Sequence, residues 1–188
     1  MASETRSSFH EALSREVHEM ANATKAAPKL YKSRIDLPES TRKEVSELLN
    51  ETLAATLDVW SQVKQAHWNV KGKDFYQLHL LFDQIAGELY EYVDLVAERI
   101  TAIGSTAHGT VRMAAHSTPL PEYPLDAVNG KEHLTAVAER LAAYGKHVRA
   151  GIDKTEDLDK DTADLYTEIS RTTDLRLWFI EAHLQADS

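Results

Sequence analysis

Long runs of the chain place apolar residues three or four positions apart, which is the spacing of a helix with one buried face. Ser40 or Thr41 can cap the start of the first helix, and Asp74 can cap the start of the second. Gly72 follows the end of the first helix, and Gly104 follows the end of the second. Apolar side chains predicted to face the core from the last helix are Leu165, Ile169, Leu175, Trp178, Phe179 and Ala182. The pattern predicts four long helices, over about 40–70, 74–104, 131–155 and 162–184.

A long connection separates the second and third predicted helices, from 108 to 129, and it contains Pro119, Pro121 and Pro124. A connection of this length can cross from one end of a helix bundle to the other. One short helical turn is expected within it, at 125–128. Two helical hairpins joined by one crossover predict an all-α, ferritin-like four-helix bundle.

The first 40 residues differ in character from the rest. They are predicted to form an N-terminal tail, mobile or partly helical, ahead of a bundle domain at 41–188. Within the tail, Phe9, Leu13, Val17 and Met20 could line one face of a short amphipathic helix.

Composition narrows the class of protein. A chain of 188 residues with 43% hydrophobic content suits a single core. Its 30 Asp and Glu against 21 Lys and Arg give a net charge of -9, which favours attraction of cations. The lack of cysteine excludes disulfides, thiol nucleophiles and Cys-based metal sites. Neither a signal peptide nor a membrane-spanning run is visible, so a cytoplasmic protein without membrane contact is expected.

His67, His79, Asp94 and Glu98 point to metal chemistry, because imidazole and carboxylate together suit divalent first-row metals such as iron. Asp94 and Glu98 lie four residues apart and share one helix face, a pattern that solvated helices also show. His79 and Asp94 are fifteen residues apart on one predicted helix, or about 22 Å along its axis. Metal bonds are only about 2 Å long, so one chain cannot bring both groups to one ion. Two antiparallel copies about a two-fold axis would bring His79 of one to Asp94 and Glu98 of the other.

A longer pattern surrounds these residues. The run QAHWNVKG at 65–72 precedes His79, Asp83, Asp94 and Glu98. The spacing is H-x11-H-x3-D-x10-D-x3-E, and it resembles the ferroxidase pattern of the Dps family of mini-ferritins at every liganding position. The similarity covers about 41–184 and includes LPEYPL at 120–125 and LWFIEAH at 177–183.

The resemblance implies a dodecameric hollow shell, built from two-fold dimers, that oxidises Fe(II) with hydrogen peroxide or dioxygen and stores ferric mineral, protecting DNA from oxidative damage. It implies that His67 and His79 come from one subunit and Asp94 and Glu98 from its mate, in a two-iron site that other divalent metals such as zinc can also occupy. Asp83 would help to hold the second iron or a bridging water.

Four other residues acquire candidate roles. Trp68 is similar to the family's aromatic neighbour of the site, which takes up stray oxidising equivalents; packing in the core is the other interpretation. Lys64, one turn before His67, either forms an ion pair near the site or is an ordinary surface lysine. Asp161 and Asp164 resemble the carboxylates of three-fold pores that draw Fe(II) inward; an acidic first turn of a helix is the alternative.

The alternative function is binding of DNA through the N-terminal tail. In that case the protein would be associated with the nucleoid. Residues 1–35 hold six basic and four acidic side chains, a net charge of +2, which many copies in a shell would multiply. A gel-shift series in rising salt, with and without residues 1–35, separates the two functions. His10 and His18 form an extra metal site or are idle, and the remaining histidines match no ligand pattern.

Overall fold

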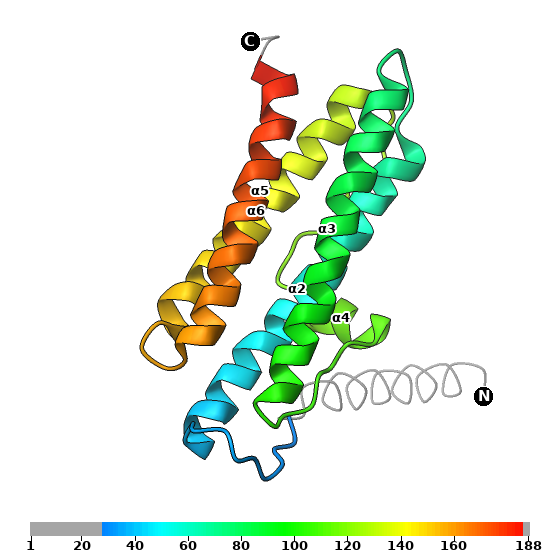
Figure 1. The fold of residues 1–188 in the computed structure, drawn as a ribbon. Coiled ribbons are helices and arrows are strands. Elements are labelled where there is room, and N and C mark those ends of the chain that lie inside the picture. The colour runs from blue at the N-terminus through cyan, green and yellow to red at the C-terminus, as the bar shows by residue number, and fades with distance from the viewer. Residues whose placement is uncertain (1–27, 186–188) are drawn as a thin grey trace, which may run out of the picture.

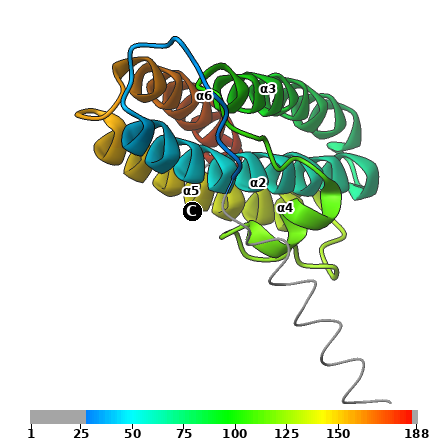
Figure 2. The ribbon, with the colours of Figure 1, turned by 90° about the horizontal axis from the view of Figure 1, so that it is seen from below.

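The computed structural model describes residues 28–185, which form four long helices and one short helix (Figure 1). They are α2 (Glu39–Asn69), α3 (Phe75–Ala102), α4 (Val111–Ser117), α5 (Gly130–Thr155) and α6 (Lys160–Gln185). α2 pairs with α3 and α5 with α6, and the crossover that carries α4 runs from one end of the bundle to the other. Viewed from below, α3 and α6 form one row and α2 and α5 the other (Figure 2). The predicted all-α, ferritin-like bundle is confirmed.

Glycine forms the turns at both ends of α3. Gly72, before the helix, has φ 112°, and Gly104, after it, has φ 81°, a region of φ that residues with a Cβ rarely adopt. Arg42 of α2 reaches this second end, where its Nη1 donates to the carbonyls of Ile103 and Tyr31, each at 3.1 Å. The segment before α2 is thereby held against the end of α3, while the amphipathic stretch predicted at 9–20 lies outside the described residues.

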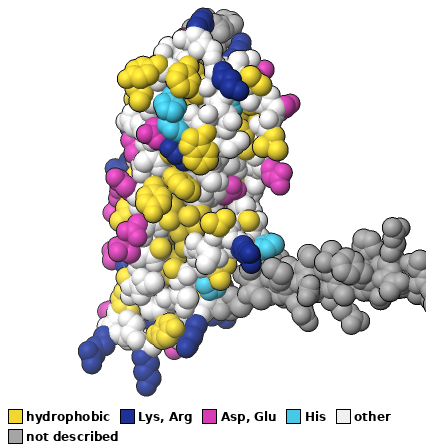
Figure 3. Space-filling model, turned by 90° about the vertical axis from the view of Figure 1, so that its right-hand side faces the viewer, with side chains coloured by type: hydrophobic (Ala, Val, Ile, Leu, Met, Phe, Trp, Pro, Cys, Tyr) yellow, Lys and Arg dark blue, Asp and Glu magenta, His cyan; other side chains and the backbone are white. Residues whose placement is uncertain are grey.

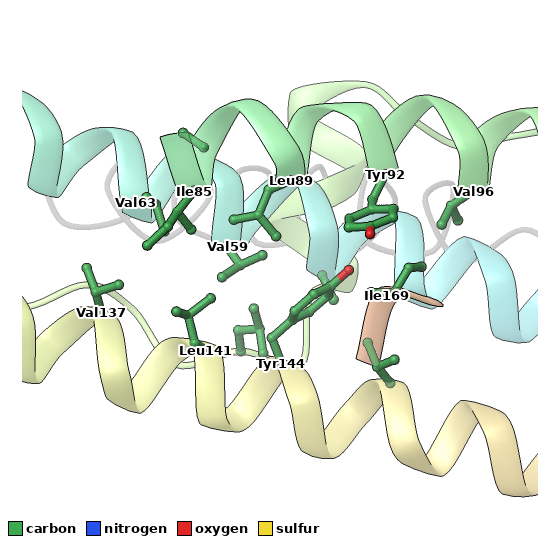
Figure 4. Packing of buried hydrophobic residues seen from close by; sticks show 14 of the residues in the cluster. Val59, Val63, Ile85, Leu89, Tyr92, Val96, Val137, Leu141, Tyr144 and Ile169 are labelled. Carbon is green, nitrogen blue, oxygen red and sulfur yellow. The ribbon is translucent and has the colours of Figure 1, made fainter. Parts of the chain in front are cut away.

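The core is formed by apolar side chains from all four long helices, and it includes buried tyrosines (Figure 4). The hydroxyl of Tyr144 lies 2.8 Å from Thr56 Oγ1, and that of Tyr166 lies 2.8 Å from Thr52 Oγ1. Burial raises the pKa of Tyr166 to about 12, so this phenol stays neutral. Because these hydroxyls have partners, the tyrosines fill the core without the cost of an unpaired polar group. None of the described helices combines the length and the apolarity that a bilayer crossing requires.

Polar caps begin the last two helices. Asn129 and Glu132 form a capping box at the start of α5. At the start of α6, Asp159 accepts hydrogen bonds from Thr162 and, at 2.5 Å, from Arg99. Burial opposes ionisation of Asp159, but these hydrogen bonds outweigh it and hold the pKa of the carboxyl below its usual range. Asp159 is therefore a structural anion that joins α3 to α6.

The short helix of the crossover is α4, and the prediction of a helical turn at 125–128 was wrong. Thr110 supplies a cap that was not foreseen, since its hydroxyl accepts from Met113 N at 3.3 Å, and Ala114 is buried as α4 packs on α2. Leu125 and Val128 are 87% and 54% exposed. Nothing buries them, so a helix there would lack the packing that stabilises short helices.

The core face of α6 also differs from its prediction. Leu175, Trp178 and Ala182 are exposed, whereas Thr173, which was not predicted, is buried beside the correctly predicted Ile169. Thr173 can face the core because its hydroxyl donates to the carbonyl of Ile169, four residues earlier, at 2.8 Å. Threonine counts as a polar residue in a hydrophobicity pattern. The pattern therefore placed the apolar face of α6 on a different side of the helix.

Gly151 of α5 lies where a side chain would collide with Tyr166. A Cβ at this position would stand 2.5 Å from Cε1 of the ring, whereas one at Gly145 would meet its nearest neighbour at 3.4 Å. We expect Gly151→Ala to destabilise the protein by about 1–3 kcal/mol through overpacking. Gly145→Ala, which fills ordinary space and gains helix propensity, should be neutral or stabilising. Thermal unfolding of both variants measures the difference, and equal midpoints would contradict the close contact.

Asp159→Asn removes the carboxylate that Arg99 binds inside the fold. We expect a loss of about 2 kcal/mol at neutral pH, the typical worth of a hydrogen bond to a charged group. Because folding lowers the pKa of Asp159, its contribution is complete above the ordinary carboxyl pKa and is lost as the pH falls through the lowered value.

Chemical denaturation of both proteins over a series of acidic pH values tests this expectation. The stability difference should shrink in acid. Asp161→Asn is the control, because the side chain of Asp161 is 84% exposed and should contribute little. A difference independent of pH would show that Asp159 does not act through its charge.

Candidate metal site

His67 and His79 meet at the end of the bundle where α2 turns into α3. His67 lies in the last turn of α2 and is buried, and His79 lies in the second turn of α3 and is partly exposed. The two rings stack with their centroids 3.7 Å apart and their planes 20° apart. The turn at 70–74 thus brings together two imidazoles that are twelve residues apart in the chain.

Reciprocal hydrogen bonds orient both rings. Nδ1 of His67 lies 2.8 Å from the carbonyl oxygen of His79, and Nδ1 of His79 lies 2.9 Å from that of His67. A carbonyl can only accept, so each Nδ1 carries a hydrogen and each neutral ring keeps its lone pair on Nε2. An imidazole that donates from one nitrogen to a backbone carbonyl is fixed in the tautomer that binds a metal through the other.

Asp83 lies one turn after His79 and adds a carboxylate. Its Oδ1 is 2.7 Å from Nζ of Lys64 and 3.8 Å from Nε2 of His67. The hydrogen bond from Lys64 lowers the pKa of Asp83, so the group is an anion at neutral pH. The ion pair considered for Lys64 is therefore present, although Asp83 is half exposed and the pair adds little to stability.

Asp94 and Glu98 lie on the same helix but away from the histidines. Both are exposed, and neither carboxylate has an ion-pair partner among residues 28–185. Fifteen residues of α3 separate His79 from Asp94, or about 22 Å. Within the described part of one chain, no group of three or more potential metal ligands is assembled. The subunit therefore presents the predicted ligands in two separate halves.

An exposed apolar surface surrounds both halves. On α2 and α3, Trp68 is 64% exposed, Tyr76 69%, Leu80 48% and Tyr90 59%. Figure 3 shows hydrophobic side chains gathered on this side of the molecule around a pair of histidines. Trp68 is not packed in the core of the subunit, so that interpretation was wrong; Lys64 Nζ stands 5.7 Å from its ring. Large exposed apolar surfaces mark sites of protein contact.

The predicted pore residues, Asp161 and Asp164, are both exposed in the first turns of α6. Asp161 is 3.9 Å from the guanidinium of Arg99, and the inner neighbour of this guanidinium is Asp159. Asp159 belongs to the same acidic run in the sequence, yet its carboxylate is buried. Of these neighbouring acidic residues, Asp159 is therefore a buried structural anion, whereas Asp161 and Asp164 are exposed carboxylates that a cation can reach.

His133 is buried and His147 is partly buried, and the sequence did not single out either of them. His133 is fully buried, with Nδ1 2.6 Å from the Tyr123 hydroxyl, and His147 Nε2 lies 2.9 Å from Thr52 Oγ1. Burial lowers the pKa of both imidazoles, which keeps them neutral. Their place on the apolar face of α5 was the available signal, and they support the core.

Comparison with known proteins agrees with the fold. A family model of the ferritin-like domain matches residues 46–188. The DNA protection during starvation protein of Agrobacterium fabrum is 38% identical over 161 residues, which cover 85% of this chain and 99% of that protein. The protein of the same name from Mycolicibacterium smegmatis is 29% identical and covers 80% of this chain and 82% of its own.

A solved structure, DpsC from Streptomyces coelicolor, has a TM-score of 0.79 to this chain at 33% identity, covering 83% of this chain and 92% of that one. The family match begins within α2 and includes the other helices of the bundle. The chain belongs to the Dps family of ferritin-like proteins.

Proposed function

We propose that this protein oxidises Fe(II) at sites shared between two subunits of a hollow homo-oligomer and stores the ferric product inside. The observation that carries the proposal is the division of the ligands. Among residues 28–185, two imidazoles whose Nε2 atoms make no hydrogen bond and two carboxylates without ion-pair partners lie on α2 and α3, too far apart to share an ion. A second copy, turned antiparallel about a two-fold axis, completes each pair of histidines with a pair of acids.

Each ligand has a role that follows from its chemistry. His67 and His79 bind the first Fe(II) through Nε2, and Asp94 and Glu98 of the partner subunit neutralise its charge. Asp83 helps to hold the second iron. An ion arriving there competes with the Lys64 ammonium for the same oxygen, so the second position is the weaker one. Zinc, which accepts the same imidazole and carboxylate ligands, can occupy the site in place of iron.

The oxidation balances with two iron ions for each peroxide. Each Fe(II) gives up one electron, and hydrogen peroxide accepts two as its O–O bond breaks to give two hydroxide ions. Pairing the irons therefore avoids release of hydroxyl radical. Dioxygen is the alternative oxidant. Trp68, exposed beside His67, takes up oxidising equivalents that escape the irons.

A dodecameric shell is the assembly that the family membership supports, with entry of iron through acidic pores. Asp161 and Asp164 are exposed carboxylates, and a net charge of -9 for each chain attracts cations to such openings. Consumption of Fe(II) and peroxide together would protect DNA without contact between protein and DNA. The names of the relatives, DNA protection during starvation protein, fit this chemistry.

Mixing of two defective variants tests whether the site is shared. His67→Ala with His79→Ala keeps the acids, and Asp94→Ala with Glu98→Ala keeps the histidines. We expect each variant to oxidise anaerobically loaded Fe(II) with peroxide at least about tenfold more slowly than the native protein. Refolding the two together should restore about a quarter of the sites, because half of the dimers are mixed and each holds one intact site. Ferric absorbance and peroxide loss measure the rates.

Glu44→Ala with Glu47→Ala is the matched control, since it removes two exposed carboxylates from α2 without touching the ligand set. Its rate should equal that of the native protein. Native rates in both ligand variants would refute the site, and variants that stay inactive when mixed would show that its two halves do not come from different subunits.

A further inference from the structure

Gly87, in the middle of α3, is not explained by any contact among residues 28–185. A Cβ built on it meets no atom within 4 Å, and its φ is not positive, unlike that of Gly72 and Gly104. Glycine destabilises a helix interior relative to alanine, because it loses more backbone freedom on folding. Gly151, by contrast, is required by the Tyr166 ring that packs on it. No contact among residues 28–185 therefore requires glycine at position 87, which directs attention to a contact with a second copy of the chain.

Gly87 lies at the centre of the divided ligand set. A two-fold axis that brings His79 of one α3 between Asp94 and Glu98 of another must pass midway between them, at about residue 87 or 88. At about 100° per residue, Gly87 points within about 20° of both Asp94 and Leu80. The same side of the helix also carries the exposed Tyr76. Gly87 therefore lies midway along α3 between the two sets of ligands and on the side of the helix that carries Asp94.

We propose that two copies of α3 cross antiparallel at Gly87, backbone against backbone, and that this contact sets the register in which the histidines of one subunit meet the acids of the other. The inference rests on the shared site proposed above and adds its geometry. Packed helix axes are usually about 8–10 Å apart, and a residue without a Cβ at the crossing lets the two backbones approach within that range with no side chain between them. The partner subunit's ligands then come close enough to share an ion.

Charge supports the antiparallel direction. The histidine end of α3 lies beside Lys64, and the other end carries Asp94 and Glu98 without ion-pair partners among residues 28–185. Antiparallel copies place the Lys64–Asp83 pair of one subunit, which has no net charge, near the acids of its mate. A parallel pair would bring four carboxylates together, and their repulsion opposes that arrangement.

A cysteine at the crossing tests the register directly, because the native chain contains none. Gly87→Cys places each thiol opposite its own copy. A disulfide needs Cα atoms about 4.4–6.8 Å apart, a separation that facing Cα atoms on helices about 10 Å apart can reach. We expect mild oxidation of the full-length variant to convert most chains to covalent dimers on a non-reducing gel, with reversal by thiol.

Leu80→Cys is the matched control. It is exposed on the same side of α3, seven residues away, so its two copies would be about 21 Å apart and stay unlinked. Cross-linking of Leu80→Cys in place of Gly87→Cys, or of neither, overturns the crossing. Circular dichroism and thermal unfolding of the reduced variants confirm that both are folded.

The two proposals fail separately. Absence of the Gly87→Cys cross-link, together with restored oxidation on mixing the ligand variants, would reject the register and leave the shared site. A Gly87→Cys cross-link without any restored oxidation would support the crossing and reject the iron chemistry.

Discussion

The rigidity of α3 is the constraint on which the candidate site depends. A helix rises about 1.5 Å per residue, and its hydrogen bonds do not let two side chains fifteen residues apart approach each other. His79 and Asp94 are held apart in this way by one continuous helix, Phe75–Ala102. The proposed metal site can therefore be completed only by another subunit. Under that proposal, assembly of the oligomer and formation of the site are the same event.

The bundle supplies the precision that such a site needs. Tyr144 and Tyr166 fill the space between the two hairpins, and their hydroxyls pair with Thr56 and Thr52 of α2. These contacts fix α2 in rotation as well as in position, because a hydrogen bond depends on direction and apolar contact does not. The rotation of α2 in turn directs His67 towards α3. Ligands supported by packed helices and by hydrogen bonds hold their geometry better than ligands on loops.

The charged residues near the start of α6 and the apolar surface of α2 and α3 have different roles. The acidic residues at the start of α6 include Asp159, which Arg99 and Thr162 bind in the interior, and Asp161 and Asp164, which are exposed to solvent. The outer side of α2 and α3 is instead rich in exposed aromatic side chains. An apolar surface interrupted by metal ligands suits a subunit contact in which water is excluded around the ions, since lower polarity strengthens the interaction of charges with them.

Sequence alone determined the long helices and the fold class of this protein and the candidate ligands of the proposed site. Helical periodicity, glycine stops and the spacing of His67, His79, Asp83, Asp94 and Glu98 are local properties, and local backbone preferences express them directly. Burial is not local. Whether Trp68 and Trp178 lie in the core or on the surface, whether the crossover helix begins at Thr110, and whether Asp159 is a buried anion all depend on which helices pack together.

The orientation of the imidazoles was likewise decided by the tertiary structure. The reciprocal hydrogen bonds of His67 and His79 exist because the turn between α2 and α3 brings one backbone to the other's ring. The sequence shows that two histidines are present, but not which ring nitrogen of each remains available for a metal. That outcome depends on distances across the fold, and such distances arise only when the helices have packed.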